Sequence, residues 1–413
     1  MKILLVAPMV PRADGPGAIP LLLHSQLIGL RQRHEVTLVT AVGDEPGEAE
    51  AVSALRADGV DAHVADRRRP AQRRERRRRR LRLARGWLGG SRPWRTVWFA
   101  EPGIQREIDR LTAAQRFDVA AVEDSSMAVY RFPAELPKVL TEHEVRRPRP
   151  IEWRPGLRPA AWGGWAFGEL DWRRWPRFQR EAWARCDLLQ AFAGRDAEAI
   201  GELAPELAAR VRVNPFGLAA PPPVDPAGEE PGTVLFVGNF THPPNRDAAR
   251  WLAGEIMPAV RERVPNSRLR LVGSSPPPEV CGLAGDGVEV IADAPSVRPH
   301  LEAASVVIAP VRIGGGMRMK VLHALASGKA VVTTTRGAEG YTEGQGPLPF
   351  FVADGAAEIA QATAKLLADV GRRRALGERA REFALAHHSP AAWAGRLEAV
   401  YAEAREPRGS RHG

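Results

Sequence analysis

The sequence predicts an α/β protein built from two doubly wound, Rossmann-like domains, and three observations carry that prediction. Short apolar runs typical of buried strands alternate with helical patterns along two separate stretches of the chain. The proline-rich segment 218–232, within "GLAAPPPVDPAGEEPG", lies between the two stretches. The chain has 413 residues, enough for two or three domains with their own cores. Because alternating strands and helices favour parallel sheets, each stretch is expected to form one sheet covered by helices.

The first domain is expected over residues 1–217. Its opening run, "MKILLVAPMVP", could be confused with a signal peptide, but Pro11 ends it and no small-residue cleavage pattern follows. We therefore expect a buried strand at residues 3–6, followed by a helix from Leu21 to Leu30. The further strands expected in this domain are "HEVTLVT", "DAHVA", "FDVAAVE" and "KVLTEHE".

The second domain is expected over residues 233–385, followed by a C-terminal helix within 386–413 that packs back onto the first domain. A helical pattern from Leu366 to Ala386 stops at His388-Ser389-Pro390, and another helix is expected from Ala391 to Ala404. The strands expected in this domain are "TVLFVGNF", "RLRLVG", "VEVIA", "SVVIAP" and "AVVTT".

Cysteine usage and hydropathy exclude several classes of protein. The two cysteines, Cys186 and Cys281, lie far apart and form neither a disulfide framework nor a C-x-x-C spacing. No run approaches the roughly 18 apolar residues of a membrane-spanning helix. The sequence contains no D-x-D triplet and no His/Cys/Asp cluster at metal-ligand spacing. A cytoplasmic protein without a metal site is therefore expected.

The positive charge of the chain is concentrated in one segment of the first domain. The formal net charge is +10, yet residues 67–85 hold twelve arginines and one glutamate, a local charge of +11. Three interpretations of this arginine-rich insertion stay open: a solvated insertion, which we place first, a patch for anionic lipid headgroups, and a nucleic-acid contact. Leu81, Trp87 and Trp98 overlap or follow the insertion, and basic residues beside such side chains suit a membrane surface. A peripheral contact with the inner face of an anionic membrane is therefore a candidate, whereas no specific nucleic acid is expected.

A second unusual segment is rich in tryptophan. Six of the eleven tryptophans fall within residues 153–183, between the last expected strand of the first domain and the proline-rich linker. Ordinary helix packing would account for them. The alternative is a surface for an acceptor or for lipid, because tryptophan suits both sugar faces and the headgroup layer.

The stretch "GGGMRMKVLHALASGKAVVTT", from Gly314 to Thr334, predicts a loop, a helix, a turn and a strand. Glycines permit close backbone approach, and a helix N-terminus offers N–H groups and partial positive charge to an anion. Arg318 and Lys320 add two full charges at that end of the helix. A phosphate site is one interpretation; glycines that only shape a turn, with two solvated cations, are the other.

The order of these landmarks resembles the GT-B glycosyltransferases, in particular the large retaining family of glycosyl transferases group 1, also called the family four type. The resemblance covers nearly the whole chain and is looser in the first half. The segments that carry it in the second half are "VLFVGNFTHPPNRDAARWLAGEIMP", "RLRLVG", "HLEAASVVIAPVRIGGGMRMKVLHALASGKAVVTTTRGAEGY" and "REFALAHHSPAAWAGRLEAVY".

The resemblance implies two domains facing a central cleft, with the acceptor bound by the first and a nucleotide sugar bound by the second. Arg318 and Lys320 would neutralise the donor diphosphate, and His143 would contact the transferred sugar near the reacting centre. From the residues alone, His143 suits capping or packing, and Asn245 suits a helix N-cap. Further donor contacts are implied for Gly15, Gly17, Gly238, Asn239, Gly315, Gly316, Met317, Val321 and His323.

His323 is a departure from the family's pattern. Many members carry two glutamates separated by seven residues, which hold the sugar and the ribose hydroxyls; Gly315 and His323 stand at those positions here. Helical spacing places His323 on the same face as Lys320. A neutral imidazole can accept a ribose hydroxyl, and the adjacent cation is expected to disfavour the charged ring.

The activity implied by the resemblance is transfer of a hexosyl group from a UDP-, GDP- or other nucleotide sugar to an unknown glycan, lipid-linked or natural-product acceptor. Retention without a metal, and no cofactor beyond the donor substrate, are expected. Two alternatives stay open: a sugar-nucleotide epimerase of the same fold, and a degenerate, non-catalytic binding module. Epimerases of this fold need a set of carboxylates, which the helix at Arg318 lacks, and a module that binds no anion has no need of its two cations.

Overall fold

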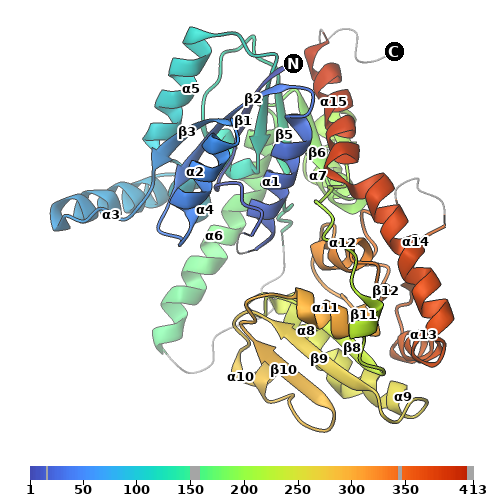
Figure 1. Ribbon diagram of the computed structural model, residues 1–413. Helices are drawn as coiled ribbons and strands as arrows, with labels where there is room; N and C mark the ends of the chain where they lie inside the picture. Colours follow the sequence, from blue (N-terminus) through green and yellow to red (C-terminus); the bar gives the residue numbers. More distant parts are fainter. Residues whose placement is uncertain (15–16, 149–158, 343–346, 407–413) are drawn as a thin grey trace. The chain divides into compact units, whose positions relative to one another are not determined.

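The computed structural model describes residues 1–14, 17–148, 159–342 and 347–406. The chain divides into two compact units, one formed by Met1–Asn214 with Ala394–Gly413 and the other by Pro215–Trp393. Each unit contains one parallel sheet flanked by helices (Figure 1), so the predicted α/β class with two doubly wound sheets is confirmed. None of the described helices is long and apolar enough to cross a bilayer.

The first unit has a seven-stranded parallel sheet in the order β3-β2-β1-β4-β5-β6-β7. The order reverses between β1 and β4, which makes a switch point at the carboxyl ends of these strands. Leu4, Val122 and Leu140 are fully buried or nearly so, and they join Trp183 in the core. The strands are β1 (Lys2–Val6), β2 (Glu35–Val42), β3 (Asp61–Asp66), β4 (Val119–Glu123), β5 (Lys138–Glu142), β6 (Leu188–Ala191) and β7 (Val211–Val213).

The last helix of the chain, α15 (Pro390–Arg405), lies mostly in the first unit. Tyr401 is fully buried and accepts a hydrogen bond from Gln26, while Glu403 pairs with Arg212. The other helices of this unit are α1 (Ala18–Leu30), α2 (Glu48–Ala57), α3 (Arg73–Leu88), α4 (Trp94–Phe99), α5 (Pro102–Ala114), η1 (Ser125–Val129), α6 (Pro159–Trp183), α7 (Gly194–Leu203) and η2 (Pro205–Arg210).

The second unit has a six-stranded parallel sheet in the order β10-β9-β8-β11-β12-β13. Its strands are β8 (Thr233–Val237), β9 (Arg268–Gly273), β10 (Val288–Ala292), β11 (Val306–Ala309), β12 (Ala330–Thr333) and β13 (Phe351–Val352). Its helices are η3 (Pro226–Gly228), α8 (Pro243–Trp251), η4 (Leu252–Ile256), α9 (Met257–Arg261), α10 (Pro278–Cys281), α11 (Arg298–Ala303), α12 (Met319–Ala326), α13 (Ala356–Ala368) and α14 (Val370–His388). The helical pattern expected from Leu366 is thus two helices, separated at Asp369, whose side chain accepts from the Arg372 amide.

The proline-rich segment 218–232 belongs to the second unit and is held by it. Arg381 donates to the carbonyl of Pro221, and Arg298 donates to the carbonyls of Pro222 and Pro223. Arg373, itself buried, pairs with Glu229. The segment is therefore fixed along one unit by arginine contacts rather than left as a solvated tether.

The tryptophan-rich segment forms α6, whose two halves differ; residues 153–158 lie outside the described part of the chain. In the second half Trp175 and Trp183 are buried in the core of the first unit. In the first half Trp162 and Phe167 are 43% and 39% exposed. The packing interpretation therefore describes the second half of the helix, and the surface for an acceptor or for lipid stays a prediction for the exposed first half.

Candidate functional site

The loop before α12 is shaped by glycines and lies against the start of α8. Gly314 and Gly316 have φ values of +90° and +83°, a backbone conformation that other residues rarely adopt. A Cβ on Gly314 would lie 3.2 Å from Cγ of Pro244. Arg336 donates a 2.9 Å hydrogen bond to the Gly314 carbonyl. The glycines therefore serve the turn, and they also bring it close to a neighbouring helix.

Arg318 and Lys320 lie at the start of α12, as the sequence predicts. Arg318 is the N-cap residue, and the buried Tyr341 hydroxyl donates to its carbonyl at 2.7 Å. Nζ of Lys320 donates to Oδ1 of Asn245 at 2.6 Å and lies 4.2 Å from the centre of the Phe236 ring. Both side chains are half-buried. Two cations from one helix turn are thus held beside an amide and an aromatic ring.

The charge of Lys320 is not balanced by acid. Burial, and secondly the nearby charge of Arg318, lower the pKa of Lys320 to about 7. No carboxylate of the described residues contributes an opposing effect. An anion placed at this helix start would favour the protonated lysine, and it would also meet the positive end of the helix.

Asn245 links this turn to the end of β8. Its Nδ2 donates to the Asn239 carbonyl at 2.6 Å while its Oδ1 accepts from Lys320. A Cβ on Gly238 would lie 2.9 Å from Cγ of Asn245, so Gly238 makes room for this side chain. The N-cap role expected for Asn245 is wrong: α8 begins at Pro243 with His242 as its N-cap, and Asn245 lies inside the first turn.

The pKa of His323 has a different cause from the one expected. It is half-buried on α12, and the pKa of its ring is lowered, as predicted. The cause is burial and not the charge of Lys320, which corrects the physical reason given for a neutral ring. A neutral imidazole keeps one nitrogen available as an acceptor.

The remaining residues for which the resemblance implies donor contacts differ from one another in burial and position. Val321 and Met317 have buried side chains, and the Val321 amide already donates to the Arg318 carbonyl. Gly315 is exposed. Gly17 has a φ of +84° and is the N-cap of α1, the helix that follows β1 in the chain, whereas Gly15 lies outside the described residues.

In the first unit His143 directly follows β5 and belongs to a buried acidic cluster. Its Nε2 lies 3.1 Å from Oε2 of Glu123, the last residue of β4, and both side chains are almost fully buried. Glu123 also accepts from Gln26 and Thr141. His143 is therefore fixed by a carboxylate that two further donors hold in place.

Burial and charge act in opposite directions on this cluster. Burial alone would lower the pKa of His143, but the hydrogen bond and charge of Glu123, with Asp124 and Glu142, outweigh it and raise that pKa. Burial, and secondly the charge of Asp124, raise the pKa of Glu142 to about 7. Glu142 accepts from Ser125 and from Nε1 of Trp183.

Asp124 is the most constrained member of the acidic cluster. Its φ of 73° is unusual for a residue with a side chain, and its carboxylate accepts from the Ser126 amide and faces Arg95 at 3.7 Å. The charges of Arg95 and His143 overcome the effect of burial and lower the pKa of Asp124. These acids are not among the predicted site residues, although "VAAVED" and "VLTEHE" both place carboxylates at the carboxyl ends of neighbouring strands.

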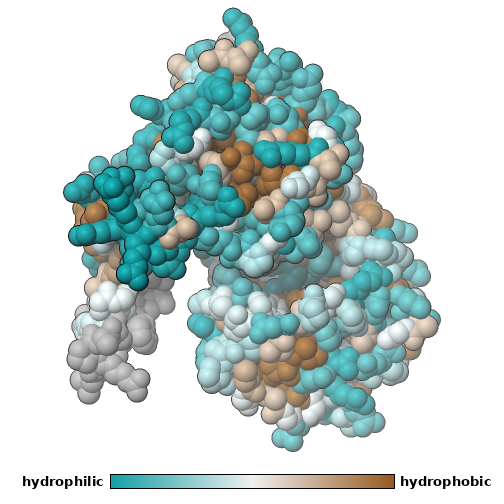
Figure 2. All heavy atoms as spheres, turned by 60° about the vertical axis from the view of Figure 1, so that its left-hand side comes forward, coloured by the Kyte–Doolittle hydropathy of each residue, from teal (hydrophilic) through white to brown (hydrophobic). Residues whose placement is uncertain are grey.

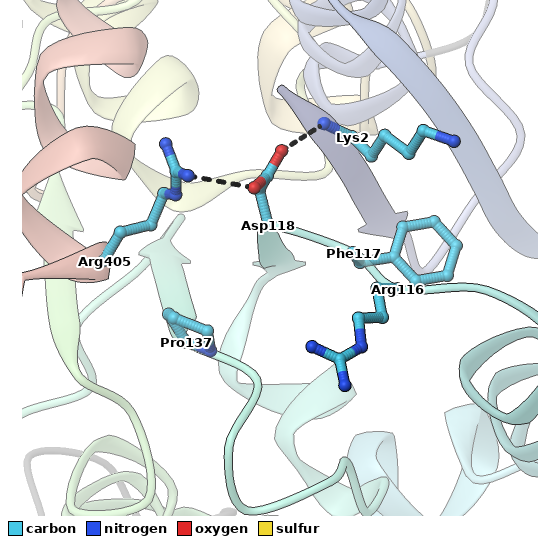
Figure 3. A pocket seen from close by; sticks show the side chains of 6 residues that line it. All are labelled: Lys2, Arg116, Phe117, Asp118, Pro137 and Arg405. Atoms are coloured by element: carbon cyan, nitrogen blue, oxygen red, sulfur yellow. Dashed lines mark hydrogen bonds and ion pairs between the residues drawn. The ribbon is translucent and has the colours of Figure 1, made fainter.

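A cavity of about 580 Å³ lies at the opposite edge of the same sheet (Figure 3). It is lined at the amino ends of β1, β4 and β5, where Asp118 accepts from the Lys2 amide at 2.8 Å and pairs with Arg405 at 3.0 Å. These contacts attach the C-terminal helix to the sheet. Among the described residues, no group of three or more His, Cys, Asp and Glu could hold a metal ion.

Comparisons with known proteins identify the second domain. Residues 231–369 match the family model described as glycosyl transferases group 1. This domain belongs to that family. The predicted resemblance to group 1 glycosyltransferases is thereby confirmed, and the protein is a glycosyltransferase. No curated protein matches the chain in sequence.

Solved structures extend the likeness to the fold of the whole chain. HepE of Anabaena, in complex with UDP and glucose, is 13% identical with a TM-score of 0.64, covering 97% of this chain and 99% of that one. Sucrose-phosphate synthase of Thermosynechococcus elongatus is 16% identical with a TM-score of 0.61, covering 97% and 98%. TarM is 9% identical with a TM-score of 0.63, again covering 97% and 98%. At these identities the likeness shows the fold, which is GT-B.

Proposed function

We propose that this glycosyltransferase takes its sugar from a nucleoside-diphosphate donor whose diphosphate is bound by Arg318 and Lys320. The observation that carries the proposal is the Lys320 ammonium, held against an amide oxygen at 2.6 Å beside a second cation. A diphosphate would accept charge-assisted hydrogen bonds from both side chains and from the first amides of α12. Its negative charge would also offset the burial and the nearby charge of Arg318 that together lower the pKa of Lys320.

UDP is the first nucleotide to test. HepE of Anabaena was solved with UDP and with UDP-glucose, and a trehalose-6-phosphate enzyme of E. coli with UDP-2-fluoro glucose. For the ribose we propose His323, which would accept a hydroxyl through its neutral ring. Gly238 and Asn239, at the end of β8, support close approach of backbone to donor phosphate.

We propose that transfer proceeds with retention and without a metal or other cofactor. The bond between the sugar and the diphosphate breaks, a bond from the sugar to an acceptor hydroxyl forms, and the acceptor proton passes to the leaving diphosphate. Arg318 and Lys320 stabilise the charge that develops on the leaving group. His143, oriented by Glu123, contacts the transferred sugar. The first-domain carboxylates are each bound by internal donors, which favours a transferase over an epimerase.

The acceptor is proposed to be bound by the first domain. Its class stays open among glycans, lipid-linked compounds and natural products. A peripheral contact with an anionic membrane at the cytoplasmic face is proposed as well, since the arginine-rich insertion belongs to this domain. Such a contact would favour a lipid-linked acceptor.

The donor proposal is tested by thermal shift with UDP-, GDP-, ADP- and dTDP-sugars. We expect one nucleotide to raise the melting temperature clearly more than the others, with or without EDTA. Stabilisation by none of the four, or stabilisation only when a divalent cation is added, would contradict the proposal. Product formed from the stabilising donor is then examined for the configuration at the transferred carbon.

A further inference from the structure

The arginine-rich insertion and the tryptophan-rich helix, distant in sequence, meet on one side of the first domain. Phe167 on α6 lies 4.6 Å from Trp87 on α3 and 6.0 Å from Trp94 on α4, between ring centres. Asp171 accepts hydrogen bonds from Nε1 of Trp87 at 2.8 Å and from the Trp94 amide at 2.5 Å. The three helices are therefore joined by tilted and edge-to-face ring contacts and by one shared carboxylate. Figure 1 shows α3 and α6 both extending away from the sheet.

Helix α3 has a packed face and an exposed face. Leu83 is buried, and a Cβ on Gly86 would lie 3.0 Å from Cγ1 of Val97 on α4. On the opposite face Leu81 and Leu88, seven residues or two helical turns apart, are 48% and 71% exposed. Helix α3 is rich in arginine, and yet two leucines lie along the centre of its exposed face.

Some arginines of α3 contact the rest of the domain, and the others are exposed. Arg76 and Arg79 donate to backbone carbonyls, Arg79 also lies over the Trp98 ring, and Arg82 pairs with Glu101. Six others are exposed and form no ion pair with the described residues. They are Arg73, Arg74, Arg77, Arg78, Arg80 and Arg85. Figure 2, which brings this side of the domain forward, shows dense hydrophilic surface over α3.

Exposed apolar side chains are concentrated on the same three helices. Of the eleven large apolar side chains that are exposed in the described residues, six lie on α3, α4 and the first half of α6. They are Leu81, Leu88, Trp98, Trp162, Phe167 and Leu170. We call these six residues and the six exposed arginines of α3 the basic-apolar platform.

We propose that the basic-apolar platform binds the surface of an anionic phospholipid membrane. Its arginines would contact headgroup phosphates, while the leucines and aromatic rings enter the boundary between headgroups and acyl chains. A solvated insertion would have no use for leucines at the centre of its exposed face. Nucleic acid would use the arginines but not aliphatic side chains, since single strands stack on aromatic rings and duplexes present phosphates. The mixture of charge and aliphatic surface therefore favours lipid.

The inference does not depend on the donor site, because every residue of the platform belongs to the first domain. Nucleotide binding consequently serves as a control for folding. A variant that loses membrane binding while a nucleotide still raises its melting temperature has lost only the platform.

The test is sedimentation of the full chain with vesicles of phosphatidylcholine alone or mixed with phosphatidylglycerol. We expect binding to the mixed vesicles only, weakened by salt, because screening shortens the reach of the arginine charges. Arg77→Glu/Arg78→Glu should weaken binding at least about tenfold, since each cation near an anionic surface contributes several-fold. Arg374→Glu/Arg379→Glu, which reverses two exposed arginines on α14, is the matched control and should bind like the parent.

The leucines separate lipid from other polyanions. Leu81→Ser/Leu88→Ser should reduce binding to the mixed vesicles, and the loss should persist at high salt, while binding to a DNA duplex should be unchanged. Brominated acyl chains should quench tryptophan fluorescence of the parent more strongly than that of this variant. Three results would each overturn the proposal: equal sedimentation with both kinds of vesicle, an arginine variant that binds like the parent, or tighter binding to DNA than to lipid with no effect of the leucines.

Discussion

Charged side chains lie at the carboxyl ends of the strands in both sheets. The two sets of side chains differ in how their charges are balanced. In the first domain His143 lies among Glu123, Asp124 and Glu142, so cation and anions neutralise one another within the protein. In the second domain Arg318 and Lys320 share a helix start with an amide as the hydrogen-bond partner of the lysine. In the first arrangement opposite charges favour the protonated histidine, whereas in the second, burial and the charge of Arg318 disfavour the protonated lysine. The pKa shifts record this difference: that of His143 is raised, and that of Lys320 is lowered.

The largest expected effect is on the second arrangement. Arg318→Ala and Lys320→Ala should each weaken nucleotide-sugar binding by roughly 1.5–3 kcal/mol, about one to two decades, and abolish most transfer, because each removes a charge-assisted bond to phosphate. Titration calorimetry and a transfer assay measure the two effects. Arg312→Ala is the matched control, since this arginine of the same loop is already paired with Asp247 at 2.7 Å. Donor affinity that is unchanged in both site variants would remove the diphosphate assignment.

The next effect concerns the first arrangement and its stability. Glu123→Gln should cost about 1–3 kcal/mol of unfolding free energy, because it removes a buried partner of His143. A raised histidine pKa stabilises the fold fully below its unfolded value of about 6.5, and this contribution is lost as pH rises through the folded pKa. The loss in the variant should therefore be larger at acidic than at alkaline pH, as denaturant unfolding can show.

Proton NMR of the His143 ring gives a second readout of the same change. Its pKa should fall in Glu123→Gln and stay near the parent value in Glu144→Gln, where the replaced carboxylate is exposed and pairs with Arg146. A His143 pKa that is the same in all three proteins would show that Glu123 does not control the ring.

A smaller effect is the pH dependence of donor binding. With a pKa of about 7 in the free protein, Lys320 must take up a proton to bind a diphosphate above that pH. Affinity should be level below about pH 7 and fall above it by up to about tenfold per unit. Lys320→Arg, whose guanidinium stays protonated, should flatten the profile. A parent profile that is flat from pH 7 to 9, roughly the range in which a lysine of lowered pKa titrates, would contradict this account.

The smallest expected effect is at His323. Ala at this position should loosen donor binding by the ~1 kcal/mol of an ordinary hydrogen bond, while Glu should preserve or tighten it. Calorimetry with donor and with free diphosphate separates a ribose contact from a phosphate contact. If Ala binds as the parent does and Glu binds worse, His323 is a packing residue of α12.

The sequence predicts the second arrangement better than the first, for a physical reason. Arg318 and Lys320 are close in the chain and share one helix turn, so local periodicity places them correctly. His143 contacts Glu123 of β4, and Glu123 is itself held by Gln26 of α1 and Thr141 of β5. Only the folded sheet brings these residues together. Asn245 shows the same dependence on contacts that are distant in sequence. Its side chain binds Lys320, which is far along the chain, and it does not cap α8.

How well each strand is predicted from the sequence depends on its length and on its neighbours in the sheet. The long apolar runs at β1, β2 and β8 are evident from the sequence alone. Three strands escaped prediction: β6, which has four residues, β7, which has three, and β13, which has two. Such short segments carry too little periodicity, and their neighbours in the sheet decide their conformation.

The measurement that tests the central claim most directly compares diphosphates with nucleosides. Calorimetry of the parent with UDP, GDP, ADP and dTDP, each beside its nucleoside, should show one pair in which the diphosphate binds far more tightly. In Arg318→Ala/Lys320→Ala the nucleoside should bind as before, and the advantage of the diphosphate should fall by about two decades or more. If that advantage survives in the double variant, the diphosphate is held elsewhere and the cations at the start of α12 have another role.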